Sequence, residues 1–381
     1  MSQRVNLDLL MEIKKYGAAD ISACFNCGNC TAVCPLTEDD ETFPRRIIRY
    51  TQLGMEDRLL GSKELWMCYN CGECSETCPR QAEPGEFMAA ARRYAIAKYD
   101  RSGLAQVLFT SPVWSITILV VLACLFALFM YTQHADISTG GPLRIFDYVP
   151  MGLIHNIGIA VLAVVGVIGA LGVVDMVRRI TRANGTKELL ASGKRLNWWA
   201  ALWDALFVET LAQKRYREDC ETTEDKPWYI QKWFLHATTM WGFLGLLVAT
   251  ASNFFLDTFK LKTPGVPNLF IHTLGTVAGV FLVYGVSLLI YKRLKPDSST
   301  YTRSHLADWI LLVLLWLAGV SGFALEILNF LPQAPLWGYY VFLFHVAISM
   351  EVTLLVPLIK FGHAFYRPVA LFFHALKPVS E

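Results

Sequence analysis

Eight cysteines near the N-terminus form two tetrads with the same spacing, C-x2-C-x2-C-x3-C-P. They are Cys24, Cys27, Cys30 and Cys34 in the first tetrad, and Cys68, Cys71, Cys74 and Cys78 in the second. In bacterial proteins this run holds two [4Fe–4S] clusters, and its fourth cysteine binds the cluster of the other run. The spacing therefore predicts one cluster on Cys24, Cys27, Cys30 and Cys78, and another on Cys68, Cys71, Cys74 and Cys34. Zinc ribbons or a single cluster are the alternatives, and two identical tetrads closed by proline disfavour both.

The histidines indicate a second kind of redox centre, because seven of the eight lie in or beside long apolar segments. Ionisable groups inside a membrane are costly and tend to be functional, and haem b can bind between two facing imidazoles. His345 and His363 are 18 residues apart, which is five turns of an ideal helix. We therefore expect both on one face of one helix, about 27 Å apart. This spacing predicts two stacked haems b, an inner one near the cytoplasm and an outer one near the opposite leaflet.

The partners of these two histidines must match them in depth. His236 and His305 begin apolar segments on the cytoplasmic side, so either can pair with His363 at the inner haem. His155 and His272 begin segments on the outer side, so either can pair with His345 at the outer haem. Depth alone leaves both choices open.

Six apolar segments, each near the roughly 20 residues that cross a bilayer, must position these histidines. They lie near 111–133, 150–176, 234–256, 268–291, 306–328 and 337–360. Hydrophobic residues make up 54% of the chain and charged residues only 17%, which is not the composition of an ordinary soluble enzyme. Lys and Arg gather in the loops that share a side with the N-terminus. The positive-inside rule therefore places the head and the C-terminus in the cytoplasm, with the chain in the inner membrane.

These features predict a mainly α-helical protein of two domains. Residues 1–103 form a cytoplasmic ferredoxin-like domain with a linker helix, and residues 104–381 form a six-helix transmembrane cytochrome b bundle. Residues 177–232 form a cytoplasmic insert, whose Trp-rich stretch lies on the membrane surface or, equally, packs on the head. Cys124 and Cys220 lie outside the tetrads and are interpreted as structural or incidental thiols.

Several classes of function are disfavoured. Residues 1–20 lack the apolar core of a secretory signal, so the cysteines are expected in a reducing compartment, where clustered thiols bind metal rather than form disulfides. No basic stripe interleaved with aromatic residues indicates nucleic-acid binding. No GxGxxG turn indicates that the chain itself binds FAD.

The two halves together resemble the membrane subunits allied to heterodisulfide reductase. The tetrads are similar to its C subunit. The segments LHATTMWGFLG, IHTLGTVAGVFLVYG and FHVAISMEVTLLVPLIKFGH resemble the haem-bearing spans of its nitrate reductase gamma-like cytochrome b, the E subunit. The fusion is similar to the QmoC family of the quinone-interacting membrane-bound oxidoreductase complex. This resemblance implies that His236 pairs with His363 and His272 with His345, leaving His155 and His305 as polar groups at helix ends.

The resemblance also implies a function and partners. Menaquinol would pass electrons through two haems b and two clusters to flavin-containing subunits of the QmoA and QmoB type, with adenylylsulfate reductase downstream in sulfate respiration. The reverse direction stays open, because a sequence does not give potentials. The alternatives are a quinone-free relay and anchor, or an electron-input module of a heterodisulfide reductase-like or sulfite-reduction complex.

A quinone site needs a proton-handling group beside an apolar cleft. Glu326 and Glu351 are the acidic residues deepest in the apolar segments, and Asp257, Lys260 and Lys262 lie at the outer mouth. These five residues are the candidates for the quinone site. For Glu351, a hydrogen bond that packs two helices is an equal alternative.

Overall fold

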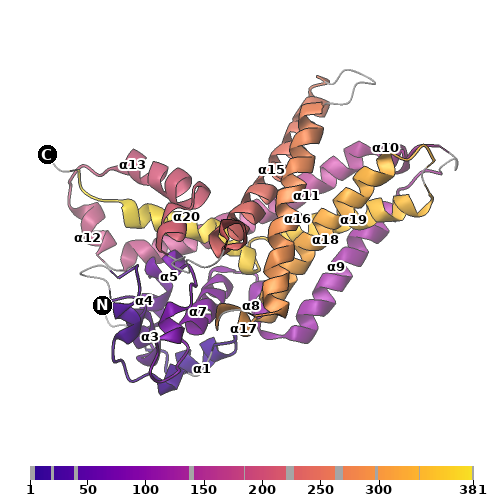
Figure 1. Ribbon diagram of the computed structural model, residues 1–381. Coiled ribbons are helices and arrows are strands. Elements are labelled where there is room, and N and C mark those ends of the chain that lie inside the picture. Colours follow the sequence, from indigo (N-terminus) through magenta and orange to yellow (C-terminus); the bar gives the residue numbers. More distant parts are fainter. Residues whose placement is uncertain are drawn as a thin grey trace.

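A computed structural model describes residues 5–18, 21–37, 42–136, 141–183, 185–219, 227–261, 269–296, 299–333 and 335–379. The regular elements in these ranges are helices, apart from an isolated bridge between Leu196 and Pro378. Figure 1 shows a head of short helices at the N-terminus, packed beside a group of much longer helices. The prediction of a mainly α-helical protein is confirmed.

Six helices are long and apolar enough to cross a bilayer in the described part of the chain. They are α9 (Pro112–Thr132), α11 (Met151–Arg182), α15 (Lys232–Thr258), α16 (Leu269–Leu294), α18 (Leu306–Asn329) and α19 (Trp337–Leu355). Each overlaps one of the predicted segments, so the chain is a multi-pass membrane protein. The short helices α8 (Leu104–Thr110), α10 (Ile145–Tyr148) and α17 (Ser299–Thr302) flank the spans.

The last span differs from the prediction. The sequence predicts one helix over 337–360 that carries His345 and reaches His363, and this is wrong. Helix α19 ends at Leu355, the turn η4 covers Lys360–Gly362, and His363 begins a separate helix, α20 (His363–Ala375). Pro357 lies in the break, and a proline inside a helix removes a backbone donor and clashes with the preceding turn. The five-turn argument that placed both histidines on one helix therefore fails.

The head is built around the long helix α7 (Pro84–Tyr99). Its other helices are η1 (Ile21–Ala23), α1 (Leu9–Lys14), α2 (Asn29–Ala32), α3 (Arg45–Gln52), α4 (Glu56–Leu60), α5 (Glu64–Met67) and α6 (Glu73–Glu76). Pro84 begins α7 at a position where the missing N–H is no loss. Leu9 of α1, Ile47 of α3 and Phe87 of α7 are fully buried, so the three helices share one core.

The core of the head continues into the membrane part of the molecule. The ring centroid of Tyr366 on α20 lies 5.0 Å from that of Trp66 and 5.1 Å from that of Tyr99, both in the head. Near the end of α11, a guanidinium nitrogen of Arg179 lies 3.4 Å from a carboxylate oxygen of Asp57 in the head. The head is therefore packed directly on the ends of α11 and α20.

The insert between α11 and α15 covers α20. It contains α12 (Thr186–Ala191), α13 (Trp198–Trp203), the π-helix η2 (Asp204–Leu211), α14 (Lys214–Asp219) and η3 (Trp228–Ile230). Trp198 contacts Phe372 of α20 at 5.8 Å between ring centroids. Trp199 is 84% exposed, and Trp203 is 61% exposed. One face of the Trp-rich stretch therefore packs on protein, and the other presents aromatic rings of the kind found at membrane surfaces.

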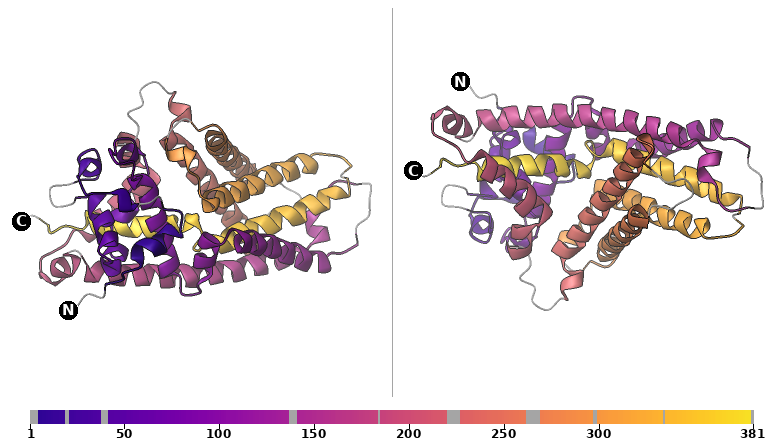
Figure 2. Two further views of the ribbon diagram at one scale, coloured as in Figure 1. Left: turned by 90° about the horizontal axis from the view of Figure 1, so that it is seen from below. Right: turned by 90° about the horizontal axis from the view of Figure 1, so that it is seen from above.

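Helices α15 and α16 form a close hairpin, seen in Figures 1 and 2 as a pair that diverges from the other long helices. Gly242 lets the two backbones approach, because a Cβ there would lie 2.4 Å from the backbone nitrogen of Leu282 and 2.7 Å from the carbonyl oxygen of Ala278. Small residues at such crossings allow tight helix packing in membranes. This contact sets the position of α15 and of His236 near its start.

The hairpin provides a stability prediction. Gly242→Ala is expected to destabilise the protein by about 1–3 kcal/mol, because the added methyl group would displace α16. Gly275→Ala is the matched control, since a Cβ at Gly275 of the same hairpin meets nothing within 4 Å. The control is expected to be neutral or slightly stabilising, because alanine favours helix over glycine. Thermal unfolding followed by circular dichroism in detergent checks this, and equal midpoints for the two variants would contradict it.

Candidate metal centres

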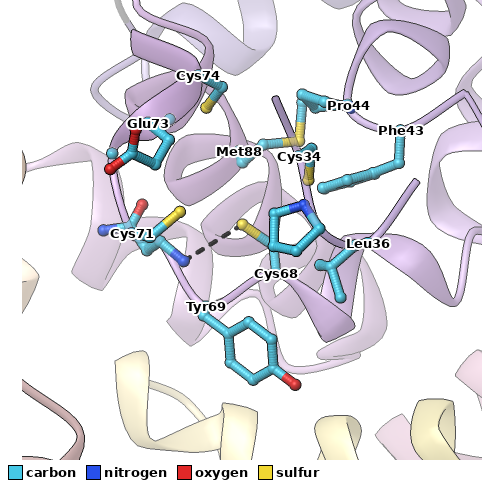
Figure 3. Close-up of a pocket in the computed structure, with 14 residues that line it drawn as sticks. Cys34, Leu36, Phe43, Pro44, Cys68, Tyr69, Cys71, Glu73, Cys74 and Met88 are labelled. Atoms are coloured by element: carbon cyan, nitrogen blue, oxygen red, sulfur yellow. Dashed lines mark hydrogen bonds between the residues drawn. The ribbon is translucent and has the colours of Figure 1, made fainter. Parts of the chain in front are cut away.

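One group of four cysteines combines residues of both tetrads. Cys34 of the first tetrad and Cys68, Cys71 and Cys74 of the second line one pocket in the head. Figure 3 shows their four sulfur atoms around a common space, with Phe43 and Met88 beside them. The fold thus brings the fourth cysteine of one run to the first three of the other, in the crossed arrangement that the spacing predicts.

The second group lies nearer the surface. Cys30 is buried and Cys27 is exposed, and an open hollow beside Cys27 is lined by Asn29, Thr77 and Pro79, among others. Burial is the main cause that raises the pKa of Cys30, and the nearby thiols of Cys24, Cys27 and Cys78 raise it further. These electrostatic contacts place Cys78 with the first three cysteines of the other tetrad.

The pKa values of the grouped cysteines are raised, so the thiols resist losing their protons unless a cationic centre is bound. Burial raises the pKa of Cys34 to about 12 and raises the pKa of Cys74 still more, and the neighbouring thiols act in the same direction. Four thiolates held together in such a site repel one another unless positive charge lies between them. Iron supplies that charge and deprotonates its thiol ligands.

The two tetrads fold alike because they share the sequence Asn-Cys-Gly. Asn26 and Asn70 have φ of 61° and 57°, and Gly28 and Gly72 have φ of 91° and 102°. Left-handed backbone is accessible to asparagine and glycine at little cost. In the second tetrad the turn directs a backbone N–H group toward sulfur, because the amide of Asn70 lies 3.4 Å from the Cys68 sulfur. Hydrogen bonds of this kind tune the potential of a cluster.

Among the histidines, the structure brings His236 and His363 together. Their ring centroids are 6.1 Å apart, with His236 one turn into α15 and His363 at the start of α20. His363 donates from Nδ1 to the carbonyl oxygen of Lys360 at 2.8 Å, and His236 Nδ1 lies 3.1 Å from Gln213 Oε1. With Nδ1 occupied by an acceptor, the lone pair of each ring is on Nε2.

This geometry fits haem b. Metal–imidazole bonds of about 2 Å on both sides of one iron place the two ring centroids about 6 Å apart. Acceptors on the outer ring nitrogens are the usual second shell of a histidine that binds a metal. Gln213 is itself held in left-handed backbone, with φ of 53°, a strained conformation that is retained where the side chain has a defined task.

The outer histidines lie around α18 without meeting. His345 Nδ1 lies 2.9 Å from Ser321 Oγ, and His272 Nδ1 lies 3.6 Å from Glu326 Oε1. Ser321 and Glu326 are a little over one turn apart on α18. Between them, a Cβ at Gly322 would lie 3.2 Å from the ring of His345. The structure therefore brings both histidines to the same stretch of α18 but does not bring their rings into contact.

The two remaining candidate histidines have other contacts. His305 caps α18, where its Nδ1 accepts from the backbone amide of Ala307 at 3.1 Å. His155 on α11 lies with its Nδ1 4.0 Å from a carboxylate oxygen of Asp257, and its ring contacts Phe254. His305 thus lies at the head side of the molecule as a helix cap, and His155 lies at the far end of α15.

The acidic candidates for a quinone site are distributed over two depths. Glu326 accepts a 2.7 Å hydrogen bond from Thr276 Oγ1 next to His272, and Asp257 lies next to His155. Glu351 is 1% exposed, inside α19. Lys260 follows the end of α15, and Lys262 lies outside the described residues, as does Cys220.

Reasoning from the sequence alone missed the residues that join the two kinds of site. They are Gln213, Tyr69, Tyr216, Lys232 and Arg367. Lys232 precedes His236 by four residues and Arg367 follows His363 by four, so each cation shares a helix face with its histidine. This four-residue spacing was the feature of the sequence that could have identified Lys232 and Arg367. The role of Gln213 and the two tyrosines depends on contacts between distant segments.

Comparisons with known families cover both halves. Residues 20–82 match the family described as 4Fe-4S dicluster domain. Residues 104–380 match the family described as citrate utilization protein B. No curated protein matches the chain significantly.

Proposed function

Because the chain belongs to the citrate utilization protein B family and its head is a 4Fe-4S dicluster domain, we propose that it transfers electrons between membrane quinone and a cytoplasmic oxidoreductase through two haems b. A dicluster head joined to six apolar helices makes the chain a membrane electron-transfer subunit. The haems, the quinone and the identity of the partner are the proposed part of the function.

One observation carries the haem proposal: the rings of His236 and His363 lie 6.1 Å apart, each with its Nδ1 held by an oxygen acceptor. These two residues would bind the inner haem. His272 and His345 would bind the outer haem, with His155 as the alternative partner. A bound haem exchanges one electron at a time, which suits the stepwise oxidation or reduction of a quinone. The protein fixes both inner rings, so that little rearrangement accompanies electron transfer.

The two cysteine groups would bind clusters that face different surroundings. Cys34, Cys68, Cys71 and Cys74 would bind the cluster that faces the bundle, and Cys24, Cys27, Cys30 and Cys78 would bind the cluster that faces solvent. The open surface at Cys27 supports a soluble partner there. We propose that this partner carries flavin, because the quinone reaction and most substrate oxidations move two electrons, and flavin converts two-electron steps into single ones.

Two identities of the partner are compatible with this head. The resemblance to QmoC supports A- and B-type flavin subunits and adenylylsulfate reductase, with menaquinol as the donor. The family name, citrate utilization, supports an oxidoreductase that acts in citrate use, with quinone as the acceptor. We favour the second partner because that family match covers most of the chain. Affinity purification of the intact chain from native membranes, followed by mass spectrometry of the bound subunits, distinguishes the two.

For the quinone we propose a site at the ends of α15 and α16 farthest from the head. Glu326 lies there beside His272, so its carboxylate would handle the proton next to a haem ligand. Asp257 lies beside His155, and this pair joins a carboxylate to an imidazole that can relay a proton. Arg179 at the head end of α11 belongs to the positively charged side of the chain, which supports a cytoplasmic head and an outer quinone site. Glu351 is the alternative site, and its buried carboxylate would place the quinone deeper in the bundle.

The position of the quinone has an electrical consequence. Electrons that move between an outer quinone site and a cytoplasmic head cross the membrane dielectric, so turnover is expected to generate a membrane potential. The protein is reconstituted in sealed vesicles, turned over with a menaquinol analogue and an artificial acceptor at the head, and followed with a potential-sensitive dye. Turnover without a potential would exclude the outer site, and absence of haem reduction by the quinol would favour the quinone-free relay.

A further inference from the structure

We propose that Tyr69 and Tyr216 form the electron route between the inner histidine pair and the cysteine group of the second tetrad. Lys232 and Arg367 bind the cysteine loop to the histidine-bearing helices and so keep the parts of this route in contact. The inference rests on the haem and cluster assignments of the proposed function. The inference adds the path between the haem and the clusters and the order in which an electron reaches the two clusters.

The cysteine loop of the second tetrad is bound directly to the membrane helices. Arg367 of α20 donates from Nη1 to the carbonyl oxygens of Trp66 and Met67, each at 3.1 Å. Lys232 at the start of α15 donates from Nζ to the carbonyl oxygen of Asn70. Two cations from two different helices thus bind the backbone on both sides of Cys68 and Tyr69. A hydrogen bond from a charged donor is stronger than a neutral one.

The same two helices carry the inner histidines. Lys232 and His236 are one turn apart on α15, and His363 and Arg367 are one turn apart on α20. Residues four apart lie on one helix face. Each helix therefore presents a histidine to the haem site and, from the same face, a cation to the cysteine loop. This coupling fixes the distance between the two sites.

An aromatic stack fills the space between them. The rings of Tyr69 and Tyr216 are parallel to within 1°, with centroids 5.2 Å apart. Tyr216 in turn contacts the ring of His236 edge to face, at 5.5 Å. The guanidinium of Arg367 lies over the Tyr69 ring at 4.5 Å. A continuous series of contacts therefore leads from Cys68 through its neighbour Tyr69 and through Tyr216 to His236.

Figure 3 shows Tyr69 next to Cys68, with its ring extending away from the four sulfur atoms. Tyr216 comes from α14 of the insert, three residues after Gln213, whose side-chain oxygen contacts Nδ1 of the same histidine. The insert therefore contributes both the acceptor that orients His236 and the ring that connects it to the head. This gives the insert a task that its surface-lying tryptophans do not explain.

The step is the transfer of one electron. With both groups bound, the electron would pass between the haem held by His236 and His363 and the cluster held by Cys34, Cys68, Cys71 and Cys74. One centre would be oxidised as the other is reduced, in either direction, with no proton transferred. The tyrosines stay closed-shell and act by contact, because electronic coupling decays faster across empty space than through packed atoms. The cluster on Cys34, Cys68, Cys71 and Cys74 is then proximal to the membrane, and the cluster near exposed Cys27 is distal.

The test uses the full chain in nanodiscs with both cofactors bound. A flash-generated flavin semiquinone reduces the haem, and haem absorbance and freeze-quenched EPR of the clusters follow the electron. Tyr69→Leu and Tyr216→Leu are expected to slow haem-to-cluster transfer by about tenfold or more, and Tyr69→Phe and Tyr216→Phe to keep it within about twofold. Tyr291→Leu is the control, because Tyr291 is an exposed tyrosine near the end of α16.

A second readout separates the route from a mere structural role. Haem content and the EPR g values of the low-spin haem are expected to be unchanged in Tyr69→Leu, because Tyr69 contacts Tyr216, and Tyr216 is the ring that contacts His236. Unchanged transfer in both leucine variants would overturn the proposal. So would a loss of transfer that only follows loss of haem. If the wild-type chain binds no haem, the proposed function itself fails, and this result is distinct from either.

Discussion

His236→Ala is expected to remove one of two b haems and to stop electron transfer between quinol and the clusters, while both clusters remain. In the described part of the chain, His236 and His363 are the only two histidines whose rings lie in contact, with centroids 6.1 Å apart, so neither has a substitute. A pyridine haemochrome assay should find the haem b content halved. Quinol-driven cluster reduction should fall by at least about a hundredfold, since ligand loss exceeds the 10–100-fold effect of a second-shell change.

The matched control is His305→Asn. His305 was the alternative inner ligand by depth, and in the structure it caps α18. Asparagine is a good N-cap, so this change keeps the helix start. Both haems should remain. If His305→Asn lost a haem and His236→Ala lost none, the inner pairing would be wrong.

Cys34→Ser is expected to damage the cluster of the other tetrad. Cys34 lies with Cys68, Cys71 and Cys74 around one pocket, so the substitution should alter the same EPR signal as Cys71→Ser. Iron and sulfide should fall toward half of their wild-type content, and partner-driven haem reduction should be lost, because this cluster lies between the bundle and the distal cluster.

Cys27→Ser provides the comparison from the same tetrad as Cys34. It should alter the other signal, because Cys27 belongs to the exposed group. Cys124→Ser, in α9 and outside both groups, should leave iron content unchanged. A Cys34→Ser spectrum that matched Cys27→Ser would mean that each tetrad binds its own cluster, and the crossed arrangement would be rejected.

Much of this protein followed from local sequence. The cysteine spacing predicted a dicluster head, which the family match confirms, and the apolar segments predicted six long helices at nearly the observed positions. Both features depend on short-range physics. Thiol spacing within one turn decides what a loop can hold, and the length of an apolar run decides whether it can cross a bilayer.

The failed prediction also has a local cause. The spacing of His345 and His363 matched five helical turns only if one helix connected them, and Pro357 breaks that helix. The proline was visible in the sequence. The sequence did not show where the chain goes after the break. That direction depends on what the next segment, α20, packs against.

The tertiary structure decided which groups meet where local patterns left a choice. His236 and His305 were equivalent by depth, although the family resemblance favoured His236. Packing of α15 on α16 through Gly242 places His236 beside His363, while His305 is a helix cap. The contact of Tyr69 with Tyr216 joins segments about 150 residues apart, and no periodicity encodes it. Sequence patterns specify what each element can bind because they act over a few residues. The pairing of elements is the result of burying their faces together, which is a property of the whole chain.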